Sequence, residues 1–340
     1  MIGNEKVYII AEAGVNHNGK LASALELIDK AKEVGADCIK FQTFKAEQVV
    51  TKNAPKANYQ LKVTDSKESQ FEMLKKLELK KEHYEILINR CKELDIDFLS
   101  TPYNFEDVDF LESLDVFGFK IASGQLTEFP FLQYVAKKNK LVIISTGMAN
   151  ISDVFNAVKT IKEVGNENII VLQCTTNYPA NISEANLHAM NTISESCDVI
   201  IGYSDHVANN YACFASVALG AKVVEKHFTL DKSMEGPDHL CSSDPKEFKE
   251  LVKGIRNIEL SLGSRLKMPS ESEKKNMYGM KRSLVLNREL PKGATIKKEY
   301  LAFKRPENGM SPNMFELVIG KKIIKSMHLD DPLQFDSIEW

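Results

Sequence analysis

The sequence predicts an α/β protein: a (β/α)8 barrel, or TIM barrel, followed by a small C-terminal domain. Eight short apolar runs alternate with amphipathic helical stretches, which is the repeat of such a barrel. The length of 340 residues suits a barrel with an appendage. A doubly wound open sheet is the alternative. It is disfavoured because no glycine-rich dinucleotide turn follows the first apolar run.

The eight predicted strands are nearly continuous in apolar residues, as parallel strands buried on both faces should be. They span Val7–Glu12, Asp37–Gln42, Ile96–Thr101, Gly118–Ser123, Leu141–Thr146, Ile169–Thr175, Val199–Ser204 and Val223–Phe228. Helical periodicity predicts helices over Leu21–Val34, Lys81–Leu94, Ser152–Val164 and Asn209–Leu219. The last barrel helix is expected from Asp244 to Leu262, with Asp244 as its N-cap and Pro245 at its first position.

The connection Lys45–Leu79, after the second strand, is the weakest part of the barrel pattern. A loop of that length in a compact domain is usually functional or disordered. In a barrel it would overhang the active face.

The pattern divides the chain into a barrel domain (residues 1–262), a polar linker or helical connector (263–281) and a small domain (282–340). The last of these has short β-like runs at Ser283–Leu286, Leu301–Lys304 and Lys322–Ile324, separated by turn signals. A unit of about 60 residues often depends on a partner surface for its stability.

Composition narrows the class of protein. The hydrophobic content of 43% and charged content of 27% are ordinary for a soluble globular protein, and the net charge of −3 gives no reason to expect nucleic acid or an anionic membrane as partner. No apolar run is long enough to span a bilayer, and the N-terminus lacks a signal-peptide pattern. The six cysteines are scattered and form no CxxC pair, so we expect reduced thiols and a cytoplasmic protein.

Conspicuous polar residues fall where the predicted strands end. They are Glu12 with Asn16-His17-Asn18, Lys40 with Gln42, Ser100-Thr101, Lys120 with Ser123 and Gln125, Ser145-Thr146, Asn177-Tyr178, Ser204-Asp205-His206, and Glu225 with His227. Alone, each of these residues is usually a satisfied structural side chain or a helix cap. Together they indicate a site, because the carboxyl ends of barrel strands converge on the face that carries the active site.

Two kinds of chemistry are indicated at this face. Lys40 and Lys120 stand in apolar runs, where a buried charge is costly unless it is compensated, and an anionic ligand would compensate both. With nearby serine hydroxyls they suit a phosphate-bearing anion. His206 and His227 end consecutive strands about 4.8 Å apart, so both imidazoles can reach one ion in an open catalytic metal site.

At these residues the sequence resembles the sialic acid synthase family, which includes N-acetylneuraminate, legionaminate and pseudaminate synthases. The similar segments cover nearly the whole chain in the family's order. They are Glu12–Gly19, Ile39–Thr43, Phe98–Pro102, Lys120–Gly124, Ser145–Met148, Gly202–His206, Glu225–Phe228, Gly236–Asp238 and Lys304–Pro306. Each motif alone is modest, and the ordered set is specific.

The resemblance implies a barrel followed by an antifreeze-like (SAF) domain, and a domain-swapped homodimer. In such a dimer the small domain of one subunit covers the barrel mouth of the other, so that Arg305 reaches the sugar of the partner's site. The reaction it implies joins carbon 3 of phosphoenolpyruvate to an amino-sugar aldehyde, adds water to carbon 2 and releases phosphate by C–O cleavage. The implied cofactor is a divalent metal, usually Mn²⁺, with Mg²⁺ or Co²⁺ as alternatives.

The resemblance also implies roles for individual residues. Glu12, Lys120, His206 and His227 would be catalytic, and the two histidines would hold the metal. Phosphoenolpyruvate would be bound by Lys40, Gln42, Lys120, Ser123, Ser145 and Ser204. The sugar would be bound by Tyr178, Asp238, Arg305 and Asn58.

Two positions depart from the family pattern. Gln125 stands where many members have glutamate, and because an amide cannot act as a general base, Glu12 is the expected base. Gln173 stands where histidine is common, and we expect it only to donate or accept hydrogen bonds.

Two other functions compete with this interpretation. A synthase of another 2-keto-3-deoxy sugar acid, acting on a phosphorylated sugar, is disfavoured by the extra C-terminal domain. A sugar-binding protein without turnover, suggested by Gln125, would leave the remaining site residues without a use. The acceptor is N-acetylmannosamine or 2,4-diacetamido-2,4,6-trideoxy-mannose. Similarity of Phe41–Lys45 and Ala57–Gln60 to legionaminate-type members favours the second sugar.

Overall fold

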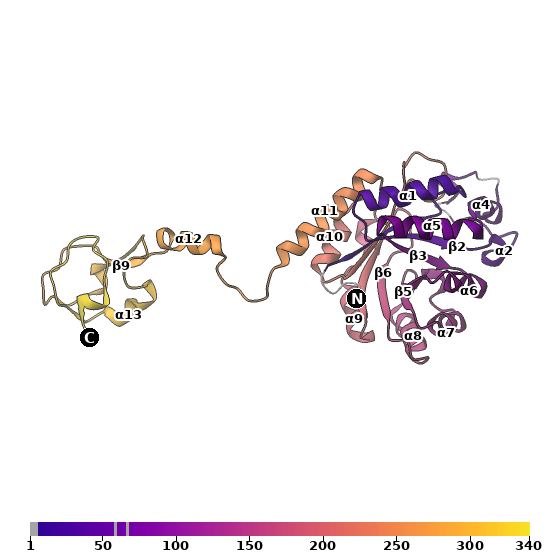
Figure 1. Cartoon of the computed structure of the whole chain (residues 1–340). Coiled ribbons are helices and arrows are strands. Elements are labelled where there is room, and N and C mark those ends of the chain that lie inside the picture. Colours follow the sequence, from indigo (N-terminus) through magenta and orange to yellow (C-terminus); the bar gives the residue numbers. More distant parts are fainter. Residues whose placement is uncertain (1–5, 58–59, 66–67) are drawn as a thin grey trace. The chain divides into compact units, whose positions relative to one another are not determined.

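The computed structural model describes residues 6–57, 60–65 and 68–340. The chain forms two compact units, one ending at Gly263 and the other spanning Ser264–Trp340 (Figure 1). Each unit has a hydrophobic core of its own, and each is described separately below.

The first unit contains eight parallel strands in the order β3-β2-β1-β8-β7-β6-β5-β4. The strands are β1 (Tyr8–Gly14), β2 (Cys38–Thr43), β3 (Asp97–Pro102), β4 (Gly118–Ile121), β5 (Leu141–Ser145), β6 (Ile169–Cys174), β7 (Ile200–Asp205) and β8 (Val223–His227). The two ends of this order, β3 and β4, also contact each other, so the sheet is a nearly closed barrel. The predicted (β/α)8 fold is confirmed, and every predicted strand is present within one or two residues.

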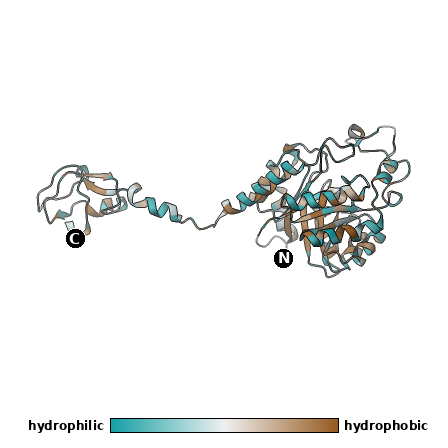
Figure 2. Ribbon diagram, turned by 45° about the horizontal axis from the view of Figure 1, so that its top comes forward, coloured by the Kyte–Doolittle hydropathy of each residue, from teal (hydrophilic) through white to brown (hydrophobic). Residues whose placement is uncertain are grey.

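Helices surround the strands on the outside of the barrel (Figure 1). They are α1 (Leu21–Glu33), α5 (Lys81–Leu94), α6 (Phe105–Ser113), α7 (Phe129–Ala136), α8 (Ile151–Lys162), α9 (Ala189–Cys197), α10 (Tyr211–Ala218) and α11 (Pro245–Leu262). Each buries apolar residues against the sheet, as Leu27 and Ile28 of α1 do, and Figure 2 shows the apolar residues concentrated on the strands. Five of these helices were predicted, namely α1, α5, α8, α10 and α11, because periodicity reports which face is buried. No helix was predicted at α6, α7 or α9.

Two helix starts show how local capping sets the boundaries. The side chain of Asp244 accepts a hydrogen bond from the Glu247 backbone N–H, which confirms Asp244 as the N-cap of α11. The start of α8 was predicted at Ser152, but its N-cap is Asn150, whose side-chain oxygen accepts from the backbone of Ser152 and Asp153. An asparagine at this position caps as well as a serine does, so the helix begins one residue earlier than predicted.

The connection after β2 contains short helices that the sequence analysis did not predict: α2 (Ala46–Val49), α3 (Gln60–Val63) and α4 (Gln70–Leu77). Ser69 and Glu72 form a capping box that starts α4. Met73 and Leu77 of α4 are buried in a small core with Phe44. Because α4 buries only two residues in eight, its pattern was too short to distinguish from a loop.

The second unit begins with α12 (Glu271–Met280), which lies within the predicted linker, and continues with small antiparallel pairs. Strands β9 (Ser283–Leu286) and β10 (Leu301–Lys304) pair together, as do β11 (Lys322–Ile323) and β12 (Ile338–Glu339). The remaining short elements of the chain are η1 (Ser123–Gln125), η2 (Ile182–Glu184), η3 (Lys298–Tyr300), η4 (Pro312–Met314), α13 (Phe315–Val318) and η5 (Phe335–Ser337).

All six cysteines are free and buried. None of the described helices is both long and apolar enough to cross a membrane.

Candidate active site

A cavity of about 440 Å³ lies at the carboxyl ends of the barrel strands. It brings together most of the predicted site residues, namely Glu12, Lys40, Gln42, Lys120, Ser123, Ser145, Tyr178, Ser204 and His206. An adjoining cavity of about 230 Å³ shares Gln42 and Tyr178 with it and is also lined by His227 and Asp238. The connection after β2 contributes Gln60 and Gln70 to both cavities, so it does overhang this face as predicted.

Two predicted sugar contacts, Asn58 and Arg305, stay predictions. Asn58 lies outside the described residues. Arg305 belongs to the second unit, where its Nε donates a hydrogen bond to the Met280 carbonyl at 3.0 Å.

Two buried lysines and two buried glutamates form a charge quartet at the floor of the cavity. The Nζ of Lys40 lies 2.7 Å from Glu12 Oε2 and 3.7 Å from Glu225 Oε2. The Nζ of Lys120 lies 3.9 Å from Glu225 Oε1. The carboxylates of Glu12 and Glu225 therefore already compensate the lysines within the chain, which the sequence analysis did not anticipate. Glu225 was noted among the polar residues at the strand ends but was given no role, although a carboxylate within an apolar strand is the same signal that identified the lysines.

The two glutamates of the charge quartet have pKa values shifted in opposite directions. Burial, together with the negative charge of Glu225, raises the pKa of Glu12 to about 7, although Lys40 opposes the shift. Burial acts to raise the pKa of Glu225 as well, but Lys120 and Lys40 hold it below its usual range. Glu225 is therefore the permanent anion, while Glu12 can gain or lose a proton near neutrality, which suits a general acid or base.

The three predicted serines each already hold a hydrogen bond in this structure. Ser145 Oγ accepts from Lys120 Nζ at 2.6 Å, and Ser204 Oγ donates to Glu225 Oε1 at 2.9 Å. Ser123 Oγ accepts from the backbone N–H of Gly147 at 3.0 Å. These contacts orient the hydroxyls around the lysines of the charge quartet.

His206 and His227 lie side by side, with ring centroids 5.3 Å apart. The Nδ1 of His206 donates to the Thr175 carbonyl at 2.7 Å in the tautomer that leaves Nε2 without a proton. Among the described residues, the buried Nδ1 of His227 has no hydrogen-bond partner. Burial holds the pKa of His227 well below its usual value, so this ring stays in the neutral form that binds metals. The pair therefore fits a divalent cation.

The neighbouring side chains leave such an ion an open coordination sphere. Within the described part of the chain, no three histidine, cysteine, aspartate or glutamate side chains are grouped so as to hold a metal. The ring of Tyr178 lies 4.1 Å from that of His206, and burial raises the pKa of Asp238 to about 6. Two histidine ligands would leave positions for water and substrate oxygens, as an open catalytic site does.

The Asn16-His17-Asn18 segment links two of the loops that surround the site. Asn16 Nδ2 donates to the Phe228 carbonyl and to Ser242 Oγ, at 2.9 and 2.8 Å, and Asn18 Nδ2 donates to the Glu235 carbonyl. These bonds tie the loop after β1 to the loop after β8, which carries Asp238. The segment is therefore a structural support for the residues of the site.

Gln125 and Gln173, which depart from the family pattern, both donate hydrogen bonds to backbone carbonyls. Gln125 Nε2 lies 3.3 Å from the carbonyls of both Pro102 and Tyr103, so its amide anchors the end of β3. A carboxylate could not donate these bonds. Gln173 Nε2 donates to the Ala185 carbonyl at 3.2 Å, which confirms its hydrogen-bonding role.

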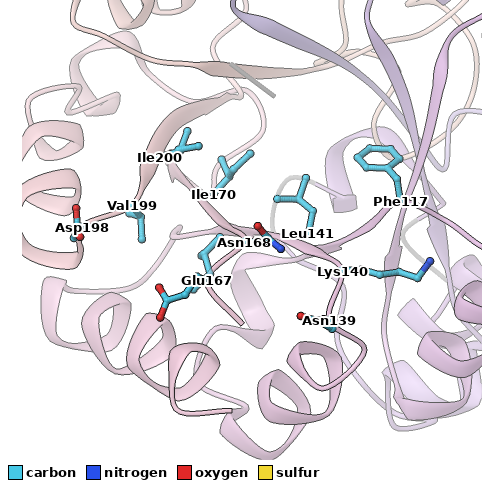
Figure 3. Close-up of a pocket in the computed structure, with 11 residues that line it drawn as sticks. Phe117, Asn139, Lys140, Leu141, Glu167, Asn168, Ile170, Asp198, Val199 and Ile200 are labelled. Carbon is cyan, nitrogen blue, oxygen red and sulfur yellow. The ribbon is translucent and has the colours of Figure 1, made fainter. Parts of the chain in front are cut away.

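A larger cavity, of about 730 Å³, lies at the opposite face of the barrel, at the amino ends of β4 to β7 (Figure 3). Its floor is formed by apolar side chains such as Leu141 and Ile170. Lys140 at its rim is already bound to Asp115. Size alone would favour this cavity, but it lacks the charge quartet and the histidine pair, and barrel enzymes react at the carboxyl ends of their strands.

Residues 27–267 match the NeuB family, and residues 281–339 match the SAF domain family. The chain belongs to the NeuB family. It is 45% identical over 329 residues to an N,N'-diacetyllegionaminic acid synthase of Campylobacter jejuni, an alignment covering 96% of this chain and 98% of that protein. It is 44% identical to the synthase of the same name in Legionella pneumophila, with 98% and 94% covered. The expected membership of the sialic acid synthases is confirmed.

A solved structure supports both the family and the fold. The N-acetylneuraminic acid synthetase of Leptospira borgpetersenii, crystallised with citrate, is 33% identical to this NeuB chain. The TM-score is 0.71, with 81% of this chain and 90% of that chain covered.

Proposed function

We propose that this enzyme condenses phosphoenolpyruvate with an N-acetylated amino-sugar aldehyde and water, forming a nonulosonic acid and releasing phosphate. The charge quartet beside the histidine pair is the observation that supports it most directly. Two buried lysines suit the phosphate and carboxylate of phosphoenolpyruvate. Glu12, which has a pKa of about 7, lies beside Lys40 and can transfer a proton.

The chemistry balances with the residues at hand. A bond forms between carbon 3 of phosphoenolpyruvate and the aldehyde carbon, and water adds to carbon 2. The bond between carbon 2 and the phosphate oxygen then breaks, so phosphate leaves by C–O cleavage. Lys40 and Lys120 hold the anion, with Gln42, Ser123, Ser145 and Ser204 around it. Glu12 accepts the proton of the attacking water, and the oxygen of the former aldehyde takes up a proton to become a hydroxyl.

The amino sugar would lie next to His227, between Tyr178 and Asp238 in the adjoining cavity. The family resemblance adds Arg305 and Asn58 as sugar contacts. Because two relatives at 44–45% identity are N,N'-diacetyllegionaminic acid synthases, 2,4-diacetamido-2,4,6-trideoxy-mannose is favoured over N-acetylmannosamine as the acceptor.

His206 and His227 would hold a divalent cation, with Mn²⁺ favoured over Mg²⁺ or Co²⁺. Such an ion supplies polarisation of the aldehyde oxygen. The chain's own part is to keep the His227 imidazole neutral and to hold the two rings next to each other. We expect His206→Ala and His227→Ala each to abolish metal-dependent turnover while the barrel still folds, because each removes one of only two protein ligands. Full activity of either variant, after chelation and addition of Mn²⁺, would contradict this assignment.

A phosphate-release assay with a sugar panel tests the reaction. Purified enzyme with Mn²⁺ and phosphoenolpyruvate would receive the diacetamido sugar, N-acetylmannosamine, its 6-phosphate, or no sugar. We expect sugar-dependent phosphate release, fastest with the diacetamido sugar. Activity only with the phosphorylated sugar would point to another sugar acid synthase. No release with any sugar, while sugar binding persists, would favour a binding protein.

The enzyme would work in the cytoplasm as a homodimer in which each SAF domain serves the partner's barrel. The family resemblance supports this arrangement, as does the small size of the second unit, which has its own core but no charge quartet among its described residues.

A further inference from the structure

A second buried ion pair lies behind the histidines, on the outward side of the barrel sheet. Lys226 Nζ and Asp205 Oδ2 are 2.6 Å apart, and both side chains are at most 2% exposed. The two residues are register partners across β7 and β8. Asp205 directly precedes His206, and Lys226 directly precedes His227.

Other groups complete the hydrogen bonding of this pair. Asp205 Oδ1 accepts from Tyr203 Oη and from the Val207 backbone N–H, both at 3.0 Å, and Oδ2 accepts from Cys213 of α10. Lys226 Nζ also donates to the carbonyls of Val207 and Asn209, at 2.7 and 3.1 Å. The network thus spans β7, β8 and the segment that leaves His206.

Stability alone is a poor reason for such a pair. Desolvating two charges costs about as much as their attraction returns, and apolar residues of similar volume often serve equally well. What apolar residues cannot reproduce is directional hydrogen bonding to specific carbonyls. The network binds the backbone that follows His206, at Val207 and Asn209, and it links β7 to β8 at the residues that precede His206 and His227.

We propose that the Asp205–Lys226 pair is a positioning device that holds His206 and His227 in one geometry for a shared divalent cation. The proposal rests on the metal site of the proposed function. Neither residue touches the ion or the substrates, because successive side chains of a strand point to opposite faces and these two point toward α10. Asp205 and Lys226 therefore position the histidines through the backbone groups to which they are hydrogen-bonded.

The test separates positioning from stability. Asp205→Leu and Lys226→Met singly leave an unpaired buried charge, so each should lower the urea midpoint of unfolding. The double variant removes both charges and should regain most of that loss. If the pair positions the histidines, the double variant should still bind Mn²⁺ at least tenfold more weakly than wild type in calorimetric titration, the scale typical of groups that orient metal ligands.

The matched control is a pair at the other end of the barrel. Arg256 Nη2 binds Asp37 Oδ2 at 2.9 Å, far along the strands from the histidines. An Asp37→Leu/Arg256→Met double variant should bind Mn²⁺ with unchanged affinity. A loss equal to that of the Asp205→Leu/Lys226→Met variant would show a general effect of removing ion pairs and would overturn the proposal.

The remaining outcomes are decisive as well. If the folded Asp205→Leu/Lys226→Met variant bound Mn²⁺ with wild-type affinity, the pair would serve packing alone, and the proposal would be rejected. If that variant does not fold, Asp205→Asn keeps an oxygen for Tyr203 and Val207 but loses the charge facing Lys226. We expect it to fold and to bind Mn²⁺ measurably more weakly, and unchanged affinity would reject the proposal. If wild-type protein binds no Mn²⁺, the metal site itself is wrong, and the proposal falls with it.

Discussion

Glu12 and Glu225 carry the same carboxyl group a few ångströms from the same lysine, yet their environments divide their roles. Glu225 lies near both lysines and accepts from Ser204, so its anion is stabilised. Among the described residues, Glu12 has Lys40 as its one ion-pair partner, and it faces the negative charge of Glu225. A pair of acids with separated pKa values is a common basis for assigning acid–base roles.

The pKa of Glu12 predicts a pH dependence. If Glu12 acts as a base in its ionised form, kcat/KM should rise with pH along a limb centred near 7, because burial raises the pKa of this carboxyl to about that value. Glu12→Gln should remove the limb together with most of the activity. Rates measured from pH 5.5 to 8.5 at saturating Mn²⁺ would check this. A limb that persists in the variant would assign the titration to another group.

Lys120 gives a prediction about substrate selectivity. Its Nζ is held by Ser145 and lies near Glu225, in a position to contact an anion entering the cavity. Lys120→Ala should raise the KM for phosphoenolpyruvate about tenfold to a hundredfold, since a charge-assisted contact contributes about 1.5–3 kcal/mol. The KM for the sugar should change far less. Equal effects on both substrates in steady-state kinetics would contradict a specific anion contact.

At the scale of elements, the helices that carry no site residue still stabilise the barrel. Helix α6 begins after Asn104, whose side-chain oxygen accepts from the Asp107 backbone N–H. The Asp107 carboxylate in turn accepts from Asn104 Nδ2 at 2.6 Å, and burial raises its pKa to about 6. The folded state thus binds the Asp107 proton more tightly than the unfolded chain, whose carboxyl titrates near its ordinary value of about 4.

This shift predicts a pH-dependent effect of Asp107→Asn on stability. A raised pKa contributes stability below pH 4 that is lost as the pH rises through 6, and the amide does not titrate. The free energy of unfolding of Asp107→Asn relative to wild type should therefore increase between pH 4 and 6 and then level off. Asp109→Asn on the same helix should show no such increase between pH 4 and 6, because a hydrogen bond from Lys138 lowers the pKa of Asp109, so its contribution to stability changes only below the ordinary value of about 4. Urea unfolding at several pH values would measure both.

At the scale of the whole molecule, subunit mixing tests the proposed crossed arrangement. Arg305→Ala protein and His227→Ala protein should each be inactive alone. Mixed dimers should regain one complete site, made of an unmutated barrel and an unmutated SAF domain. If each SAF domain served its own barrel, both sites in a mixed dimer would stay defective. Activity that does not recover after verified subunit exchange would therefore exclude the crossing.

The sequence by itself determined the barrel, its strand positions and most of the candidate site. Hydrophobic periodicity is local, because a buried strand or helix face must be apolar residue by residue. Barrel geometry then gathers the residues at strand ends onto one face. The sequence alone therefore groups four residues of the site: Lys40, Lys120, His206 and His227. Family membership follows from the same residues in the same order.

Only the tertiary structure decided which partners these residues have. Glu225 of β8 lies near Lys40 of β2 and Lys120 of β4, although neither strand is its neighbour in the sheet. Asn16 supports the loop after β8 across more than 200 residues of sequence. The short helix α4 exists because its few apolar residues reach a small core at the barrel mouth. Contacts between segments far apart in the chain depend on alignment in space, which no local pattern records.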